Sequence, residues 1–198
     1  QAVVYLEENI PLVYSFLPGQ EIVRVYDGEH PGYDAVVAVD TGDMGRLGKR
    51  AEIFKAAQTT VNIDHHATND GFAQINLVRT EASAVGEIIH ALLREMGVKP
   101  DPDISTCLYV AITTDTGGFR YSNTTPLTHE IAADLVRNGV HVAEVSRQVF
   151  DTVSLQKVML MGMAVQSLRL FLNGKTAIIT VTEEMMQRAG AKDEDCDG

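Results

Sequence analysis

The chain has 198 residues, of which 45% are hydrophobic and 22% are charged, values close to the average of globular proteins. These values exclude a disordered or fibrous chain, and no apolar run approaches the ~18 residues that a membrane-spanning helix requires. Acidic residues outnumber basic residues by 27 to 16, and the net charge is -11. Because such a surface repels long polyanions, we expect no unaided binding of duplex DNA, although bound cations would allow a small phosphorylated ligand.

Two short apolar runs that end in an aspartate predict buried strands. They span residues 34–40 and 59–64, and the first is apolar almost throughout, as is typical of a parallel sheet. Residues 46–57 between them can supply the crossover helix of a right-handed β-α-β unit. In open α/β sheets, ligands bind at the carboxyl ends of the strands. Asp40 and the sequence Asp64-His65-His66 occupy those positions.

The rest of the chain is predicted to be mainly helical. Apolar residues recur at helical spacing in several segments that Gly or Pro residues delimit. The predicted helices span residues 82–96, 103–115, 126–138, 142–150 and 154–168. Asn173-Gly174 lies between two apolar runs and predicts a β-hairpin, and Thr182 is expected to cap a short helix before an acidic tail. The predicted fold class is therefore α/β, a parallel β-sheet flanked by helices with a short C-terminal β-hairpin.

The change of character near residue 168 suggests a domain boundary. We expect residues 1–168 to form one α/β domain, and residues 169–198 to form a hairpin that starts a second domain. The N-terminus has neither an initiator Met nor a basic region, so we expect a piece of a longer protein. Two cysteines cannot form a disulfide framework in a chain of this length, and we expect reduced thiols in a cytoplasmic protein.

Asp64-His65-His66 is the sharpest chemical signal. A neutral imidazole nitrogen is a good ligand for Mn, Zn or Fe, and carboxylates supply harder oxygen donors. Adjacent side chains of a strand point to opposite faces, so both imidazoles can face one site only if the backbone turns after the strand. A surface His pair beside a strand-capping Asp is the alternative, and this motif alone supports the two interpretations equally.

Other polar residues are candidates for the same site. Asp40 ends a buried strand, where a carboxylate is costly unless it is paired or holds a cation. Asp115 ends a predicted helix, whose dipole disfavours a negative charge by up to ~1 kcal/mol, so a cation would compensate there. Ser83 starts a helix whose amides can receive a phosphate, and Arg120 and Asn123 follow Asp115 closely enough to contact one. Ordinary loop, helix-start, surface and turn roles explain most of these residues as well.

Four segments follow one another at specific spacing. They are Val39-Asp40-Thr-Gly-Asp43, Ile63-Asp64-His65-His66-Ala-Thr-Asn69, Glu81-Ala-Ser-Ala-Val-Gly-Glu87 and Thr114-Asp115-Thr-Gly-Gly-Phe119-Arg-Tyr-Ser-Asn123. In this order the segments resemble motifs of the DHH phosphoesterase superfamily, and most of all its bacterial branch of oligoribonucleases and 3'-phosphoadenosine-5'-phosphate (PAP) phosphatases. The resemblance covers residues 36–168, and it identifies residues 1–168 as a DHH catalytic domain.

The resemblance implies a role for each residue. In that family, two Mn²⁺ ions at the strand ends activate a water that attacks phosphorus. Asp40 resembles the carboxylate that bridges both ions, and His65 and Asp115 resemble further metal ligands. His66 resembles the catalytic residue that contacts the phosphoryl oxygens, and Asp64 its supporting partner. Ser83, Arg120 and Asn123 remain candidates for substrate binding, and Mg²⁺ or Co²⁺ are alternatives to Mn²⁺.

Two parts of the family pattern are not found. These are the first motif, His-x-x-x-Pro-Asp-x-Asp, which supplies further metal ligands, and the C-terminal substrate domain. We expect truncation at both ends to be the cause. The chain alone is then expected to bind at most one metal ion, weakly, and to have little or no hydrolase activity.

The sequence therefore predicts part of a metal-dependent phosphoesterase that hydrolyses short oligoribonucleotides or PAP, with a homodimer as one assembly. Other hypotheses within the same chemistry are a RecJ-type exonuclease, a cyclic dinucleotide phosphodiesterase and a pyrophosphate or polyphosphate hydrolase. A non-catalytic nucleotide-binding module is an alternative of a different class, and a coincidental cluster in an ordinary α/β domain is the third. The catalytic alternatives differ mainly in the missing C-terminal domain.

Overall fold

A computed structural model of the protein describes residues 2–29 and 32–196. The chain divides into two compact units, Gln1–Val149 and Phe150–Gly198. This division falls earlier in the chain than the boundary predicted after residue 168. The domain organisation of the protein therefore stays a prediction, and each unit is described by itself.

The first unit is built on a parallel sheet with the strand order β3-β4-β5. Its strands are β3 (Ala35–Val39), β4 (Thr59–Asp64) and β5 (Ile75–Val78). Val39 pairs with Ile63, so β3 and β4 end at the same edge of the sheet. The two strands predicted to end in aspartate are confirmed. Three further strands were not predicted, namely β5 and a separate parallel pair formed by β1 (Val4–Leu6) and β2 (Val23–Val25).

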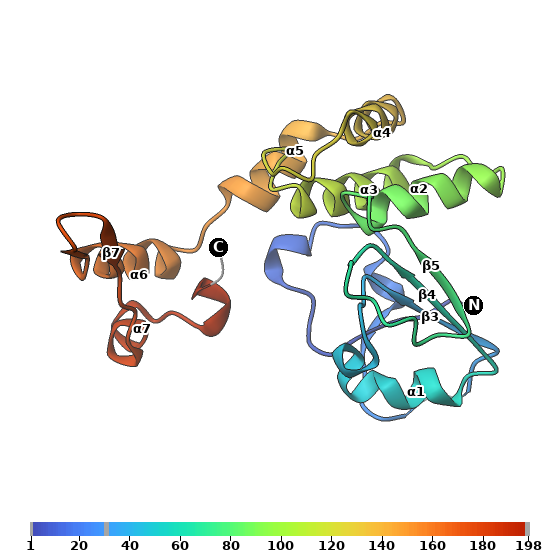
Figure 1. The fold of residues 1–198 in the computed structure, drawn as a ribbon, viewed down its shortest axis with the longest axis horizontal. Coiled ribbons are helices and arrows are strands. Elements are labelled where there is room, and N and C mark those ends of the chain that lie inside the picture. The colour runs from blue at the N-terminus through green and yellow to red at the C-terminus, as the bar shows by residue number, and fades with distance from the viewer. Residues whose placement is uncertain (1, 30–31, 197–198) are drawn as a thin grey trace. The chain divides into compact units, whose positions relative to one another are not determined.

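Helical segments cover both faces of this sheet (Figure 1). On one face, Ala38 packs with Leu47 and Phe54 from the crossover connection. On the other face, Ile63 packs against Val85 and Ile88 of α2 (Val85–Glu95). The core of the unit is therefore layered, and α2 is held against the strand that ends in Asp64.

The crossover connection differs from the predicted helix over residues 46–57. It begins as the 3-10 segment η3 (Met44–Arg50) and becomes α-helical only in α1 (Ala51–Ala56). Gly48 adopts a φ of 54°, which lies in the left-handed region and cannot continue an α-helix. Gly48 thus prevents one continuous helix across the connection.

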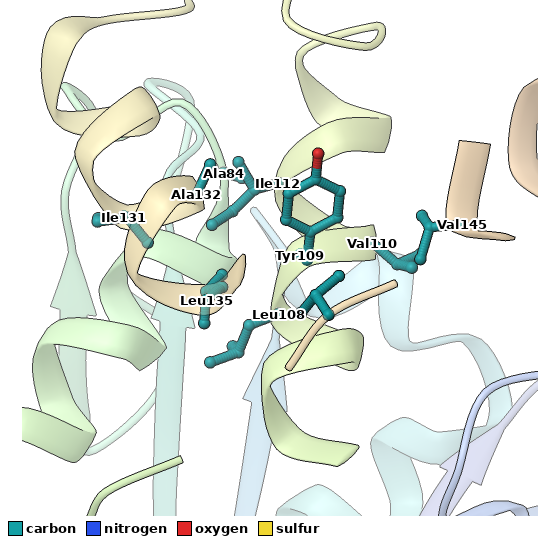
Figure 2. Packing of buried hydrophobic residues seen from close by; sticks show 10 residues of the cluster. Ala84, Leu108, Tyr109, Val110, Ile112, Ile131, Ala132, Leu135 and Val145 are labelled. Atoms are coloured by element: carbon teal, nitrogen blue, oxygen red, sulfur yellow. The ribbon is translucent and has the colours of Figure 1, made fainter. Parts of the chain in front are cut away.

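The remaining helices of the first unit are α3 (Pro102–Asp115), α4 (Pro126–Arg137) and α5 (Val142–Ser146). Side chains such as Ile112 and Leu135 are buried between α3 and α4 (Figure 2). The predicted ends of α3 and α4 are confirmed to within one residue, since α3 begins at Pro102 and stops before Gly117, and α4 begins at Pro126. The helix predicted over residues 142–150 is shorter, because after α5 the chain winds into the π-helical turn η4 (Arg147–Asp151).

The second unit contains a helix, a strand pair and a second helix. These are α6 (Leu155–Gln166), β6 (Arg169–Phe171), β7 (Thr176–Ile178), α7 (Glu183–Ala189) and the 3-10 turn η5 (Asp193–Cys196). The antiparallel pairing of β6 with β7 confirms the predicted hairpin, and Thr182 caps α7 as predicted. Both cysteines are free. Across the described part of the chain, no helix has the length and apolarity needed to cross a membrane.

Candidate metal centre

The site begins where β3 ends. Asp40 has a φ of 56°, in the left-handed region that Asp tolerates better than most residues, and its amide donates to the Ile63 carbonyl at 2.9 Å. The Thr41 carbonyl accepts from the side-chain amides of Asn62 and Asn69, at 3.1 and 3.3 Å. These bonds fasten the loop after β3 to the end of β4, so the unusual backbone at Asp40 is held by its neighbours.

Both imidazoles of the Asp64-His65-His66 sequence turn toward Asp40. Nε2 of His65 lies 3.5 Å from Asp40 Oδ1, and Nδ1 of His66 lies 3.8 Å from the same oxygen. Regular strand pairing ends at Asp64, which lets two consecutive side chains face one point. One ligand atom from each of the three residues Asp40, His65 and His66 lies within 4.8 Å of the others, a spacing that can hold a metal ion.

Asp115 approaches this group from the helical layer. Its Oδ2 lies 3.9 Å from His65 Nε2, although the residue is not one of the three within mutual reach of a single ion. Burial, and then the negative charge of Asp40, raise the pKa of Asp115, while the two imidazoles act in the opposite direction. A carboxylate in this position, at the C-terminal end of α3, is destabilised until a cation neutralises it.

The position of Asp115 follows from the packing of three elements. α2 packs on β4, and α3 packs closely on α2. A Cβ atom added at Gly86 would lie 3.0 Å from Ile112 Cγ1, so a glycine is what allows the two helices to approach so closely. This stack places the end of α3 beside the ends of the strands.

A hydrogen bond fixes the orientation of His65. Its Nδ1 lies 3.1 Å from the Ala82 carbonyl, an atom that only accepts, so Nδ1 carries the proton. Nε2 therefore presents its lone pair toward Asp40 and Asp115. A ligating histidine in proteins has this arrangement, with the second nitrogen bonded to a carbonyl or carboxylate. The imidazole and carboxylate donors around His65 are therefore of the kind that suits a divalent cation such as Mn²⁺.

His66 is held in a different way. Its Nδ1 lies 2.7 Å from Oδ1 of Asp64, whose side chain is fully buried. Burial alone would raise the pKa of Asp64, but hydrogen bonds from His66 and Asn69 outweigh it and lower the pKa. Asp64 is then ionised at neutral pH and accepts the Nδ1 proton. Because Nδ1 of His66 is engaged in this way, Nε2 is the nitrogen that can meet a ligand.

The three residues predicted to bind substrate lie around Asp115 in different surroundings. Ser83 is 1% exposed, and its hydroxyl donates to the Glu87 carboxylate. The side-chain amide of Asn123 donates to the carbonyls of Ser83 and Asp115, each at 3.1 Å. Arg120 is exposed, and its Nε donates to the Gly117 carbonyl at 2.5 Å. Of these three side chains, Arg120 is therefore the exposed one whose terminal guanidinium nitrogens remain available to a ligand.

Three further residues, Asn62, Asn69 and Tyr14, were not predicted to take part in the site. Asn69 Nδ2 donates to Asp64 Oδ2 at 2.6 Å and to Asn62 Oδ1 at 2.7 Å, so the two amides brace both the acidic residue and the Asp40 loop. The buried amide of Asn62 between the apolar residues Val61 and Ile63 was a usable signal. Burial, and then the charge of Asp115, raise the pKa of Tyr14, which keeps its phenol protonated near the site. No local pattern pointed to Tyr14.

Comparisons with known sequences agree with this arrangement. Residues 2–112 match the DHH family, N-terminal domain. The chain is 31% identical over 195 residues to the bifunctional oligoribonuclease and PAP phosphatase NrnA of Thermus thermophilus, with 98% of this chain and 57% of the relative covered. It is 28% identical over 192 residues to the protein of the same name from Bacillus subtilis, covering 94% of this chain and 60% of the relative. The chain thus spans about three fifths of the length of these relatives.

A solved structure has the same fold. It is that of an exopolyphosphatase-related protein from Bacteroides fragilis, with a TM-score of 0.91 and 22% identity over 99% of this chain and 61% of that chain. A putative family II inorganic pyrophosphatase from Methanococcus jannaschii is more distant, with a TM-score of 0.50 and 18% identity over 78% of this chain and 55% of that chain. Since the family match covers more than half of the 198 residues, the chain belongs to the DHH family.

Proposed function

We propose that the protein is a metal-dependent phosphoesterase that hydrolyses short oligoribonucleotides or PAP. The observation that carries this proposal is the convergence of Asp40, His65 and His66 at two neighbouring strand ends, with Asp115 facing His65. The names of the two NrnA relatives support this choice of substrates. We propose Mn²⁺ as the cation, with Mg²⁺ or Co²⁺ as alternatives, since the donors are imidazole and carboxylate.

Each residue of the site has a separate role in this proposal. Asp40, Asp115 and Nε2 of His65 would hold a divalent cation, which when bound lowers the pKa of a coordinated water and neutralises charge on the phosphoryl group. Nε2 of His66 would contact the phosphoryl oxygens, and the hydrogen bond from Nδ1 to Asp64 would fix the orientation of that ring. Among the described residues, the terminal nitrogens of Arg120 have no hydrogen-bond acceptor, and we propose that they bind a phosphate. Ser83 and Asn123 would hold the segment that carries Asp115 and Arg120 in position.

The exposed side chains of β3 support a larger site than the described residues form. β3 is an edge strand of the described sheet, and the helices leave part of it uncovered, since Val37 and Val39 are each 49% exposed. Parallel sheets normally have both faces covered. We propose that a further segment covers β3 and supplies the remaining acidic ligands beside Asp40. The present chain should then bind at most one metal ion and hydrolyse substrate slowly or not at all.

Titration calorimetry with Mn²⁺ tests the metal centre on this chain. We expect one weak site, which Asp40→Ala abolishes. Asp43→Asn is a matched control, because Asp43 lies in the same loop but caps η3 and pairs with Arg46 at 3.3 Å. Two tight sites would contradict the proposed stoichiometry, and the absence of any binding would contradict the metal centre itself.

Activity is tested on a protein that contains this chain and has the full length of the NrnA relatives, of which the chain spans about three fifths. We expect Mn²⁺-dependent release of mononucleotides from short oligoribonucleotides or of phosphate from PAP, and its loss in Asp40→Ala. Cleavage of inorganic pyrophosphate with neither nucleotide product would overturn the proposed substrates. The acidic surface supports small substrates over duplex DNA, and we propose a cytoplasmic enzyme, with a homodimer as its candidate assembly.

A further inference from the structure

An aromatic ring lies across a glycine next to the candidate metal centre. A Cβ atom added at Gly117 would lie 2.3 Å from Cζ, 2.5 Å from Cε1 and 2.6 Å from Cε2 of Tyr121. These three carbons surround the phenol end of the ring, and the nearly equal distances place Gly117 against a face of the ring. The other side of the residue is open, since Tyr121 is 59% exposed.

The backbone beneath this ring is firmly held. The amide of Tyr121 donates to the Thr116 carbonyl at 3.0 Å, and the Tyr121 carbonyl accepts from Thr124 at 3.1 Å. The hydroxyl of the fully buried Thr116 donates to the Ile112 carbonyl at 2.7 Å and accepts from the Phe119 amide at 3.1 Å. Tyr121 therefore combines a fixed backbone and one supported face with an exposed face. This is the form of a platform on which another planar group can stack.

The platform lies next to both the metal ligands and a cation. Gly117 is two residues from Asp115, so their Cα atoms are at most about 7 Å apart. The Arg120 guanidinium is anchored to the same glycine, since its Nε donates to the Gly117 carbonyl at 2.5 Å. An aromatic face and a guanidinium therefore both lie at Gly117, two residues after Asp115. Bases stack on aromatic side chains and phosphates pair with guanidinium groups, so this pair of side chains suits a nucleotide.

We propose that Tyr121 stacks on a base of the substrate while Arg120 binds an adjoining phosphate. The proposal rests on the proposed phosphoesterase function and restricts its substrates to molecules that carry a nucleobase. A pyrophosphate or polyphosphate hydrolase has no use for an exposed aromatic platform at this position. Stacking of one base on an aromatic side chain corresponds to roughly 5- to 150-fold in affinity.

The composition of the chain provides a clean reporter. The chain has no Trp, so Tyr121→Trp places a single indole at the proposed platform. The variant is titrated with PAP, AMP, ribose 5-phosphate and inorganic pyrophosphate, with Mg²⁺ as the cation. We expect the two nucleotides to quench the indole fluorescence and the two base-free ligands to leave it unchanged. Equal quenching by all four ligands would overturn the stacking role.

Equilibrium dialysis of labelled PAP on the unmodified chain separates this proposal from the proposed function. Bound PAP together with a base-specific signal from the indole supports both. Bound PAP without any fluorescence change overturns the platform and leaves the nucleotide phosphoesterase standing. If neither PAP nor a dinucleotide binds at millimolar concentration, both proposals fail for this chain.

Two substitutions provide a second readout. Tyr121→Leu should weaken PAP binding roughly 5- to 150-fold, whereas Tyr121→Phe, which keeps the aromatic face, should bind as the parent does. Mn²⁺ affinity and ribose 5-phosphate binding should be the same in both variants. The exposed Leu127 lies on the neighbouring helix, and Leu127→Ala is the control for loss of surface apolar area. Equal PAP affinity for the Leu and Phe variants would overturn the proposal.

Discussion

His66 is bound through Nδ1 to Oδ1 of Asp64 at 2.7 Å, and Asp64 is fully buried. Asn69 donates to the second oxygen of the same carboxylate at 2.6 Å. The carboxylate therefore has a donor on each oxygen and cannot itself reach a cation at the surface of the site. The hydrogen bond to Asp64 fixes the ring plane and the tautomer of His66, and it leaves Nε2 available to a ligand.

Asp64→Asn should lower the proposed phosphoesterase activity by about 10- to 100-fold, the usual effect of removing a partner that orients a functional histidine. The amide keeps the shape of the side chain but cannot accept from both His66 and Asn69. The kcat for a short oligoribonucleotide measures the loss, and ¹⁵N NMR of the imidazole reports the tautomer. An unchanged tautomer with unchanged kcat would show that Asp64 does not orient His66.

Asn69→Ala should destabilise the first unit by about 1–3 kcal/mol, because it removes the side-chain donor from Oδ2 of Asp64 and from Oδ1 of Asn62, both in buried residues. Urea unfolding of the chain, followed at the amides of β3 and β4 by hydrogen exchange, measures the effect.

The matched control for Asn69→Ala is Asn76→Ala. Asn76 is exposed, and its side-chain amide bonds only to the backbone of its own turn. We expect a smaller effect there, within about 1 kcal/mol. If Asn76→Ala lowered the free energy of unfolding as much as Asn69→Ala, the buried network around Asp64 would contribute no more to stability than an exposed turn.

The strand ends and the helix ends could be predicted because each depends on local chemistry. Asp40 and Asp64 follow apolar runs, and Gly117 ends a helical pattern. β1, β2 and β5 were missed because three or four residues are too few to show an alternation. The network of Ser83 could not be predicted, since Thr128 lies 45 residues away and only the packing of α4 brings it within 3.0 Å. Contacts of this kind are decided by tertiary structure.

Two helical glycines should respond in opposite ways to substitution by alanine. Alanine favours a helix by up to ~1 kcal/mol over glycine. At Gly162 in α6 an added Cβ meets nothing within 4 Å, so Gly162→Ala should stabilise α6 by about that amount. At Gly86 the Cβ would lie 3.2 Å from the Leu108 carbonyl oxygen and 3.3 Å from Ala111 Cβ, and crowding of this kind costs ~1–3 kcal/mol.

Gly86→Ala should therefore lower the protection of amides in α2 and α3, and Gly162→Ala should raise it in α6. Hydrogen exchange resolved by helix separates the two effects, because the glycines lie in different units. If Gly86→Ala stabilised α2, the two helices would not be as closely packed as the structure indicates. Mn²⁺ binding offers a further test, since separation of α3 from α2 would also displace Asp115.

Asp115 should stabilise the metal-bound protein and destabilise the metal-free protein. Burial and the charge of Asp40 raise its pKa above the ordinary value of 3.8, so the folded state binds this proton more tightly than the unfolded state. Stability from this group is therefore greatest at low pH and is lost as the pH rises through the raised pKa. In EDTA at pH 7, Asp115→Asn should melt at a higher temperature than the parent, and the difference should shrink toward pH 4. Added Mn²⁺ should raise the melting temperature of the parent more than that of the variant. If the variant were less stable than the parent in EDTA at pH 7, the carboxylate would have a cationic partner in the folded chain and would not be destabilised in the absence of a metal ion.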